Sequence, residues 1–312
     1  MSLPHLEGQP FAQRVLSAAL GSGRTASAYL FEGPPGCGKK TAALDLASAL
    51  VGGEDAWRRA SQRLHPDVRL FSPAGASFKV EQVHSIIEEA SLRPFEGDRK
   101  VFILDRVEDF TPAAANALLK PLEEPAASLT WILVTTQRAN VLPTIASRCQ
   151  SVRFHPLDEA SLRAVLQREL AVDARRARDL AALSGGSVRQ AAWYEGEDGK
   201  AQLQQAEAFL EAAASGSLIR RLDWVESVQD QRRGLDGLLG LLWILLRERW
   251  VEARGYPASL KLLQDPPRHG KALPPESLEA LMQGVARCQA ALARNGNAPL
   301  ALHALALCGL RP

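Results

Sequence analysis

Cysteine is scarce in this chain, and its cysteines are never paired in the sequence. The four of them, Cys37, Cys149, Cys288 and Cys308, are scattered without a C-x-x-C spacing. That spacing is typical of a zinc site, and regularly spaced cysteines are typical of a disulfide-stapled secreted domain. The sequence therefore predicts neither zinc nor a disulfide framework, and a reducing cytosol is the expected setting.

Long apolar runs and an N-terminal export signal are also lacking. The most apolar stretch, Leu238 to Leu246, is far shorter than the roughly 20 residues that a membrane-spanning helix needs. Pro4 and Glu7 interrupt the basic-then-apolar pattern that a signal peptide would require. We expect a cytoplasmic protein without membrane contact. Residues 238–246 are expected to form a buried helix, either at a domain or subunit contact or inside the core.

An excess of charge of one sign is lacking too. The chain has 37 Lys and Arg against 35 Asp and Glu, a net charge of +2, which does not predict nucleic-acid binding. Scattered basic residues could follow a DNA backbone or merely solvate helix faces, and we favour the second. These residues are Lys79, Arg93, Arg99, Lys100 and Lys120. A length of 312 residues allows two or three domains.

A nucleotide-binding motif is present but altered at its last position. Residues 33–40 read Gly-Pro-Pro-Gly-Cys-Gly-Lys-Lys and match the phosphate-loop pattern G-x-x-x-x-G-K-[ST] except at Lys40. The glycines let backbone N–H groups surround the phosphates, and Lys39 would reach the outer ones. The missing hydroxyl is normally a ligand of Mg²⁺, and an ammonium group cannot ligate a metal. Thr41 does not replace it, because the next residue of a helix points about 100° away.

The acidic motif that accompanies a phosphate loop is altered as well. The apolar run of residues 101–104 ends in Asp105, but Arg106 follows where active ATPases carry a glutamate that positions the attacking water. Glu108 lies two residues further on and would need a different backbone path to take that role. Two separate changes, at the metal ligand and at the water-positioning residue, predict no intrinsic ATP hydrolysis.

Strand and helix signals alternate from the N-terminus to about residue 156. Apolar runs predict strands at 28–32, 68–71, 101–105, 131–135 and 152–154. This alternation predicts a parallel α/β sheet with ligands at the carboxyl ends of its strands. Strand signals then stop, and the remaining sequence is rich in Ala and Leu. We predict an α/β core over 1–156, a small helical lid over 157–198 with a hinge at 195–200, and an all-helical domain over 199–312.

Further motifs follow one another in an informative order. They are Gly8-Gln9, His65-Pro66-Asp67, Val80-Glu81-Gln82-Val83, the run Ala114 to Lys120 with Leu122-Glu123-Glu124-Pro125, Ser147-Arg148-Cys149 and Gly186-Ser187-Val188-Arg189. Together with the phosphate loop they resemble the AAA+ clamp-loader family of bacterial DNA polymerase III, over most of residues 5–190. The resemblance implies an AAA+ core, a helical lid and a C-terminal oligomerisation collar. Residues 52–66 contain no cysteine, so the zinc module of many relatives is not expected here.

The resemblance implies roles for particular residues. Arg148 would be an arginine finger that reaches ATP bound by a neighbouring subunit; the alternative is an exposed arginine in a weak salt bridge. Thr135 or Thr136 would be the sensor-1 residue or would satisfy loop backbone. Arg189 would be the sensor-2 residue or would only hold the lid to the core. The implied degenerate nucleotide site comprises Gly33, Gly36, Gly38, Lys39, Lys40, Asp105, Thr135 and Arg189.

The resemblance also implies partners, and three functions remain in contention. The lost glutamate and the Lys40 substitution favour a non-hydrolysing ring member over the gamma/tau motor. Such a member would contact gamma/tau and the delta subunit, and through them the sliding clamp and primed DNA. The alternatives are a self-sufficient AAA+ ATPase and a nucleotide-binding scaffold outside replication. No cofactor is certain, and whether the loop binds ATP without hydrolysis stays open.

Overall fold

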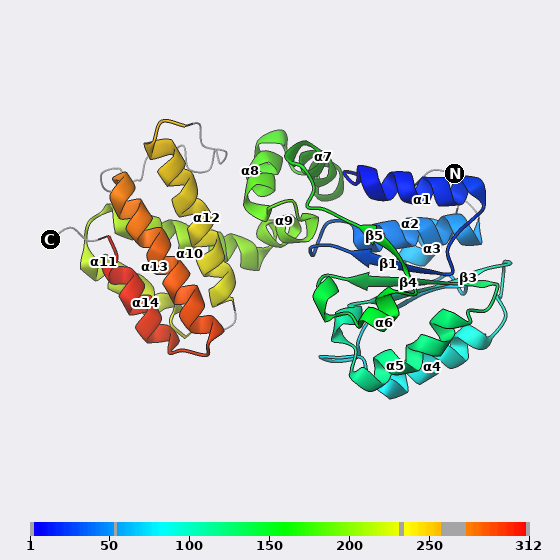
Figure 1. The fold of residues 1–312 in the computed structure, drawn as a ribbon. Helices are drawn as coiled ribbons and strands as arrows, with labels where there is room; N and C mark the ends of the chain where they lie inside the picture. Colours follow the sequence, from blue (N-terminus) through cyan, green and yellow to red (C-terminus); the bar gives the residue numbers. More distant parts are fainter. Residues whose placement is uncertain (1–2, 53–54, 231–233, 257–272, 310–312) are drawn as a thin grey trace. The chain divides into compact units, whose positions relative to one another are not determined.

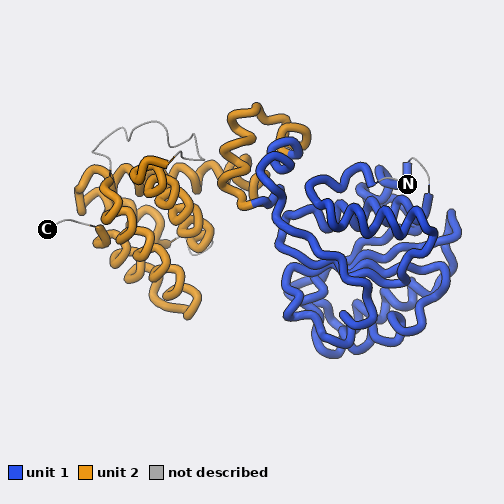
Figure 2. Tube along the Cα trace, turned by 45° about the horizontal axis from the view of Figure 1, so that its top comes forward, with its two compact units in different colours: residues 1–165, 186–189 blue, residues 166–185, 190–312 orange. Residues whose placement is uncertain are grey.

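The computed structural model describes residues 3–52, 55–230, 234–256 and 273–309. The described residues form two compact units, the first comprising 1–165 and 186–189 and the second 166–185 and 190–312 (Figure 2). The unit boundaries pass through two helices, so this division does not test the domain boundaries predicted at 156 and 198. Those boundaries stay predictions.

The first unit is built on a parallel sheet. In the described residues the sheet has five strands in the order β2-β3-β4-β1-β5, with every pair parallel. The strands are β1 Ala28–Glu32, β2 Val68–Phe71, β3 Lys100–Asp105, β4 Leu129–Thr135 and β5 Gln150–Arg153. The predicted α/β sheet is confirmed, with β5 beginning and ending slightly earlier than the apolar run suggested.

Helices cover both faces of this sheet. Figure 1 shows α1, α2 and α3 on one face and α4, α5 and α6 on the other. These helices are α1 Pro10–Ser22, α2 Lys39–Val51, α3 Ala56–Ser61, α4 Val80–Ser91, α5 Pro112–Glu123 and α6 Pro143–Ala146, with 3₁₀ turns η1 Val107–Asp109 and η2 Arg138–Asn140. Because both faces are covered, every residue of β1, β3 and β4 is buried. Burial on both faces of the sheet explains why these strands appear as continuous apolar runs in the sequence.

The helix α5 shows how the local sequence sets a boundary. Thr111 precedes it in an extended conformation, and its Oγ1 accepts a hydrogen bond from the Ala114 N–H at 3.2 Å. Pro112 follows at the first helical position, where its missing N–H costs nothing. The predicted cap and start of this helix are confirmed. The helix carries Glu123, which belongs to the candidate site, at its last position.

The rest of the chain is helical where it is described. The helices are α7 Glu159–Leu170, α8 Ala174–Ser184, α9 Val188–Glu195, α10 Glu197–Ala214, α11 Leu218–Val228, α12 Leu235–Ala253, α13 Pro275–Ala293 and α14 Ala298–Leu307. The stretch 195–200 that was predicted as a hinge contains a break at Gly196, which separates α9 from α10 and caps the latter, and its role as a hinge stays a prediction. Acidic and glycine residues in this stretch form the first turn of α10 rather than a loop.

The apolar stretch 238–246 lies in α12 and packs inside the second unit. Leu238, Leu239, Leu242 and Leu246 are at most 2% exposed. Of the two interpretations left open by the sequence, the structure supports core packing within the chain. No described helix is both long and apolar enough to cross a membrane.

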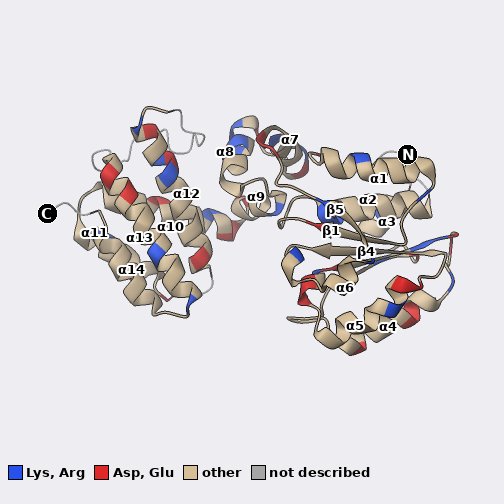
Figure 3. Ribbon diagram, viewed as in Figure 1, with Lys and Arg blue, Asp and Glu red and all other residues tan. Residues whose placement is uncertain are grey.

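Charged residues do not gather by sign along the ribbon in the view of Figure 3. Basic and acidic positions are interspersed along α4 and α5 and along α12. Two of the basic residues in question have structural roles: Lys100 is 5% exposed and donates to the Glu89 carbonyl at 2.8 Å, and Arg99 donates to Thr25 Oγ1 at 2.7 Å. Lys100 is therefore available neither to DNA nor to solvent.

Candidate nucleotide site and arginine finger

The phosphate loop leaves the carboxyl end of β1 and enters α2. Gly36 and Gly38 have φ of 76° and 93°, which an L-residue with a side chain adopts only with strain. Lys39 is 5% exposed, and its ammonium donates to the Gly33 carbonyl at 2.6 Å and to the Pro34 carbonyl. The lysine therefore ties the two ends of the loop together.

Burial sets the protonation chemistry of the loop. Burial lowers the pKa of Lys39, while Cys37, Glu108 and Asp105 oppose that shift. Burial also raises the pKa of the Cys37 thiol, against the effect of the neighbouring Lys39. The Cys37 thiol donates to the Pro34 carbonyl at 3.0 Å. Cys37 is thus a protonated packing residue and not a nucleophile.

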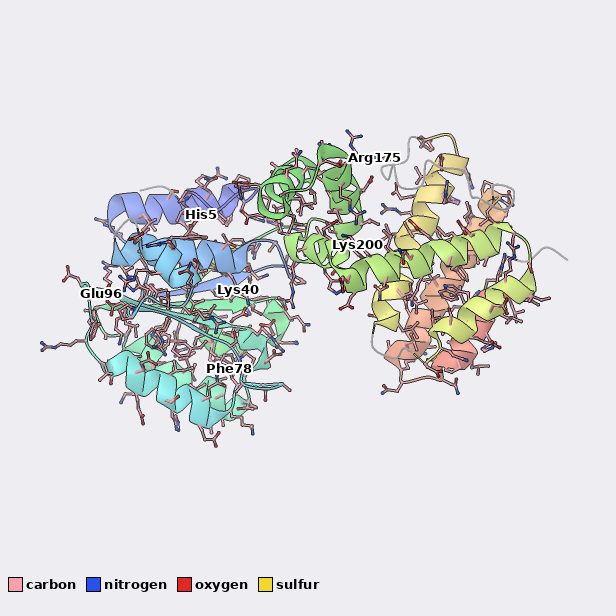
Figure 4. All side chains as sticks on the ribbon, turned by 180° about the vertical axis from the view of Figure 1, so that it is seen from behind. His5, Lys40, Phe78, Glu96, Arg175 and Lys200 are labelled. Atoms are coloured by element: carbon pink, nitrogen blue, oxygen red, sulfur yellow. The ribbon has the colours of Figure 1, made fainter. Side chains whose placement is uncertain are left out.

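Lys40 pairs with the carboxylate of the acidic motif. Its ammonium lies 2.6 Å from Asp105 Oδ2, with side-chain exposures of 52% for Lys40 and 9% for Asp105. Figure 4 labels Lys40 at the start of α2 beside the sheet. In an intact site, a hydroxyl at position 40 and the carboxylate at position 105 face each other across Mg²⁺. A direct ion pair joins these two positions here. The sequence analysis did not predict this ion pair. The signal for it was present, because a lysine replaces the hydroxyl residue at position 40 and would face the aspartate at position 105.

Arg106 and Glu108 have separate environments at the end of β3. Arg106 adopts a left-handed conformation with φ of 63°, and its guanidinium pairs with Asp109. Glu108 Oε1 accepts hydrogen bonds from Thr136 N at 2.9 Å and Thr136 Oγ1 at 2.6 Å. Burial acts to raise the pKa of Glu108, but the hydrogen bonds from Thr136 outweigh it and hold the pKa below its ordinary value. Glu108 is therefore a carboxylate at neutral pH.

The two threonines at the end of β4 differ in their contacts. Thr135 is fully buried, and its Oγ1 accepts a hydrogen bond from the Gln137 N–H at 3.0 Å. Thr136 instead uses its hydroxyl on Glu108. Thr135 satisfies loop backbone, as the second interpretation of the sequence had it. Its predicted sensor role remains a prediction.

Residues 186–189 lie directly on the phosphate loop. Val188 N–H donates to the Gly36 carbonyl at 3.0 Å, and a Cβ added to Gly36 would overlap Ser187 Oγ and lie 2.9 Å from the Arg189 Cβ. Gln9 braces the loop from another side, because its Nε2 donates to the Cys37 carbonyl at 3.1 Å and to the His155 carbonyl at 2.6 Å. The motifs that were recognised separately in the sequence thus meet at one loop.

Arg148 lies at the opposite end of the sheet from this loop. It precedes β5, whose first residue pairs with Tyr29 near the amino end of β1, whereas the loop follows Glu32 at the carboxyl end of β1. The Arg148 guanidinium donates through Nε to Glu123 Oε1 at 2.7 Å, through Nη2 to the same oxygen and through Nη1 to the Thr144 carbonyl at 2.8 Å. Arg148 therefore does not join the other predicted site residues.

The neighbouring thiol supports this part of the chain structurally. Burial raises the pKa of Cys149 to about 12, against the opposing effect of the Arg138 charge. A thiol with such a pKa is protonated at neutral pH and has little nucleophilic character. Cys149 packs against the core cluster that includes Ile145 and Ala146 of α6. The segment that presents Arg148 is thereby anchored to the core.

Comparison with known proteins identifies a family match and several similar chains. Residues 8–158 match the family described as "DNA polymerase III, delta subunit". DNA polymerase III subunit delta' of Bacillus subtilis is 38% identical over 165 residues, which cover 50% of each chain. The subunit delta' of Pseudomonas aeruginosa is 34% identical over 209 residues, covering 63% of this chain and 64% of that protein.

The similarity extends to a second kind of subunit. DNA polymerase III subunit gamma/tau of Mycobacterium tuberculosis, strain H37Rv, is 34% identical over 178 residues, which cover 54% of this chain and 31% of that protein. The chain thus spans about half to two thirds of the length of the two delta' relatives and about a third of the gamma/tau relative. The family match over residues 8–158 includes the phosphate loop and Arg148.

Proposed function

Because residues 8–158 match the family described as "DNA polymerase III, delta subunit" and two delta' proteins are 38% and 34% identical to this chain, we propose that this protein is a delta'-type, non-hydrolysing subunit of a bacterial clamp loader. It contributes Arg148 as an arginine finger to the ATP site of a neighbouring gamma/tau subunit. Its partners are gamma/tau and delta, and the assembly acts in the cytoplasm, loading a sliding clamp onto primed DNA during replication.

One observation carries the proposal that Arg148 acts in trans. Arg148 lies just before the amino end of β5, while the chain's own phosphate loop follows the carboxyl end of the adjacent β1. The two lie at opposite ends of adjacent strands, so the guanidinium cannot serve the chain's own phosphates. A guanidinium donates in a planar fork that suits the oxygens of a phosphoryl group. A neighbour's nucleotide is the target that fits this placement.

The pair with Glu123 is compatible with this role. The side chains are 32% exposed for Arg148 and 47% exposed for Glu123, and partly exposed ion pairs contribute about 0–1 kcal/mol. A triphosphate offers several negative oxygens against one carboxylate, so it competes effectively for the guanidinium. Glu123 holds the finger in place until a neighbour's nucleotide arrives.

The isolated protein is expected to show no steady-state ATP hydrolysis. Lys40 pairs with Asp105 where Mg²⁺ would be held, and Arg106 pairs with Asp109 where a water-positioning glutamate would stand. Phosphate release from the purified chain, with Mg²⁺ and with or without primed DNA, should stay at the level of a buffer blank. Turnover that disappears in Lys39→Ala would instead assign the chain to the motor class.

That motor function is the second candidate. It is favoured by the similarity to gamma/tau and by Lys39, the retained lysine of the phosphate-loop motif. The two candidates differ in where the catalytic groups are found. A motor hydrolyses ATP alone, whereas the proposed subunit changes hydrolysis only when a gamma/tau partner is added.

A further inference from the structure

The positions that would hold Mg²⁺ in a phosphate-loop protein do not fit a metal ion in this chain. Such an ion needs oxygen ligands in near-octahedral geometry, one of them the hydroxyl at position 40. Lys40 offers an ammonium with no lone pair, and that ammonium lies 2.6 Å from the carboxylate at position 105. No cluster of three or more His, Cys, Asp or Glu side chains elsewhere in the described residues replaces these ligands. The site therefore carries its own cation.

The loop itself keeps the shape that surrounds phosphates. Gly36 and Gly38 have the positive φ values that turn successive N–H groups inward, and α2 begins at once behind them. Lys39 maintains this shape through its bonds to the Gly33 and Pro34 carbonyls. The change at position 40 thus alters what balances the phosphate charge and leaves the backbone cradle in place.

The charges around the loop suit a polyanion. Lys39, Lys40 and the exposed Arg189, whose Cβ lies beside Gly36, bring three positive charges. Asp105 and Glu108 bring two negative charges, and Thr136 hydrogen bonds to one oxygen of Glu108. An ammonium has three donors, and the Lys40 side chain is 52% exposed, so donors remain for a phosphate oxygen beside the contact with Asp105.

We propose that the Lys40 ammonium takes the place of the divalent cation, so that this phosphate loop binds a nucleoside triphosphate independently of magnesium and does not hydrolyse it. Lys40 bridges Asp105 and the outer phosphates, while the backbone N–H groups of the loop, which Lys39 holds in shape, bind the remaining oxygens. A magnesium ion already bound to the nucleotide would meet the ammonium as a like charge and would weaken binding. The proposal concerns the chain's own pocket and holds whether or not Arg148 acts on a neighbour.

The test is nucleotide affinity with and without a divalent cation. Calorimetric titration of the full chain with ATP, once in excess EDTA and once in excess Mg²⁺, should give a dissociation constant in EDTA at least as low as that in Mg²⁺. Lys40→Ala should weaken binding in EDTA by about tenfold or more, because it removes the bridging cation. Lys40→Thr, which restores the hydroxyl, should reverse the preference and bind ATP more tightly in Mg²⁺ than in EDTA.

The control is Lys79→Ala, which removes an exposed lysine before α4 and should leave both affinities unchanged. Circular dichroism and the thermal midpoint of each variant establish that it is folded. Binding that requires Mg²⁺ in the unaltered chain would overturn the proposal. It would equally be overturned if ATP bound in neither condition, or if Lys40→Ala bound as well as the unaltered chain in EDTA.

Discussion

Replacing Arg148 by alanine should lower ATP turnover at the neighbouring gamma/tau site by about 10³-fold or more, while the subunits still assemble. The reason is that an arginine finger stabilises the charge that spreads over the transferring phosphoryl group, a contribution of roughly 10³ to 10⁵ in rate. The measurement is steady-state phosphate release by the reconstituted complex with primed DNA and clamp, together with the rate of clamp loading. Size-exclusion chromatography follows assembly.

Glu123→Ala is the matched control for this experiment. Both substitutions remove the same ion pair, but only Arg148→Ala removes the guanidinium. Because a partly exposed pair contributes about 0–1 kcal/mol, Glu123→Ala should change turnover by no more than about fivefold. Arg153→Ala removes another exposed arginine, which pairs with Glu32, and should have little effect. Equal losses in Arg148→Ala and Glu123→Ala would mean that the pair is structural. Full activity of the Arg148→Ala complex would reject the finger.

Replacing Gly33 by alanine should lower the thermal stability of the chain more than the same substitution at a glycine with open space around its Cα. A Cβ at this position, where φ is 152°, would overlap the Phe154 carbonyl oxygen, which is backbone and cannot move aside alone. Overpacking of this kind costs about 3 kcal/mol. At roughly 2 °C per kcal/mol for a chain of this size, the midpoint measured by circular dichroism should fall by about 6 °C.

Gly23→Ala separates this steric effect from the cost of backbone conformation. Gly23 has φ of 67° and ψ of 5°, in the left-handed region, but a Cβ added there would meet no atom within 4 Å. Its substitution should cost about 1 kcal/mol, the strain of a left-handed residue, and lower the midpoint by about 2 °C. Equal shifts for the two variants would contradict the crowding at Gly33. The contact between Gly33 and the Phe154 carbonyl, just after β5, would then not be the reason that position 33 needs glycine.

Much of the α/β fold could be predicted because double burial leaves a direct trace in the sequence. The strands β1, β3 and β4 are buried on both faces and are apolar throughout. The start of α5 could also be predicted from Thr111 and Pro112, since a helix cap and the first turn depend only on neighbouring residues. The sequence could not show that residues 197–200 are helical, because glycine and acidic residues suit both a loop and the first turn of a helix, and only packing decides between them.

The candidate site was predictable as a set of motifs but not as a set of contacts. Glycine spacing identified the loop, and the residue types identified what was missing at positions 40 and 106. The pairs Lys40 with Asp105 and Arg148 with Glu123 join residues 65 and 25 positions apart in the chain. Such pairs depend on how strands and helices are placed in three dimensions, which single-sequence periodicity does not encode.

The most direct measurement is a structure of the assembled complex with a non-hydrolysable ATP analogue bound to the gamma/tau neighbour. The account predicts the Arg148 guanidinium within hydrogen-bonding reach, about 3 Å, of the outermost phosphate of that nucleotide. A guanidinium still paired with Glu123 and facing solvent, remote from every bound nucleotide, would contradict it.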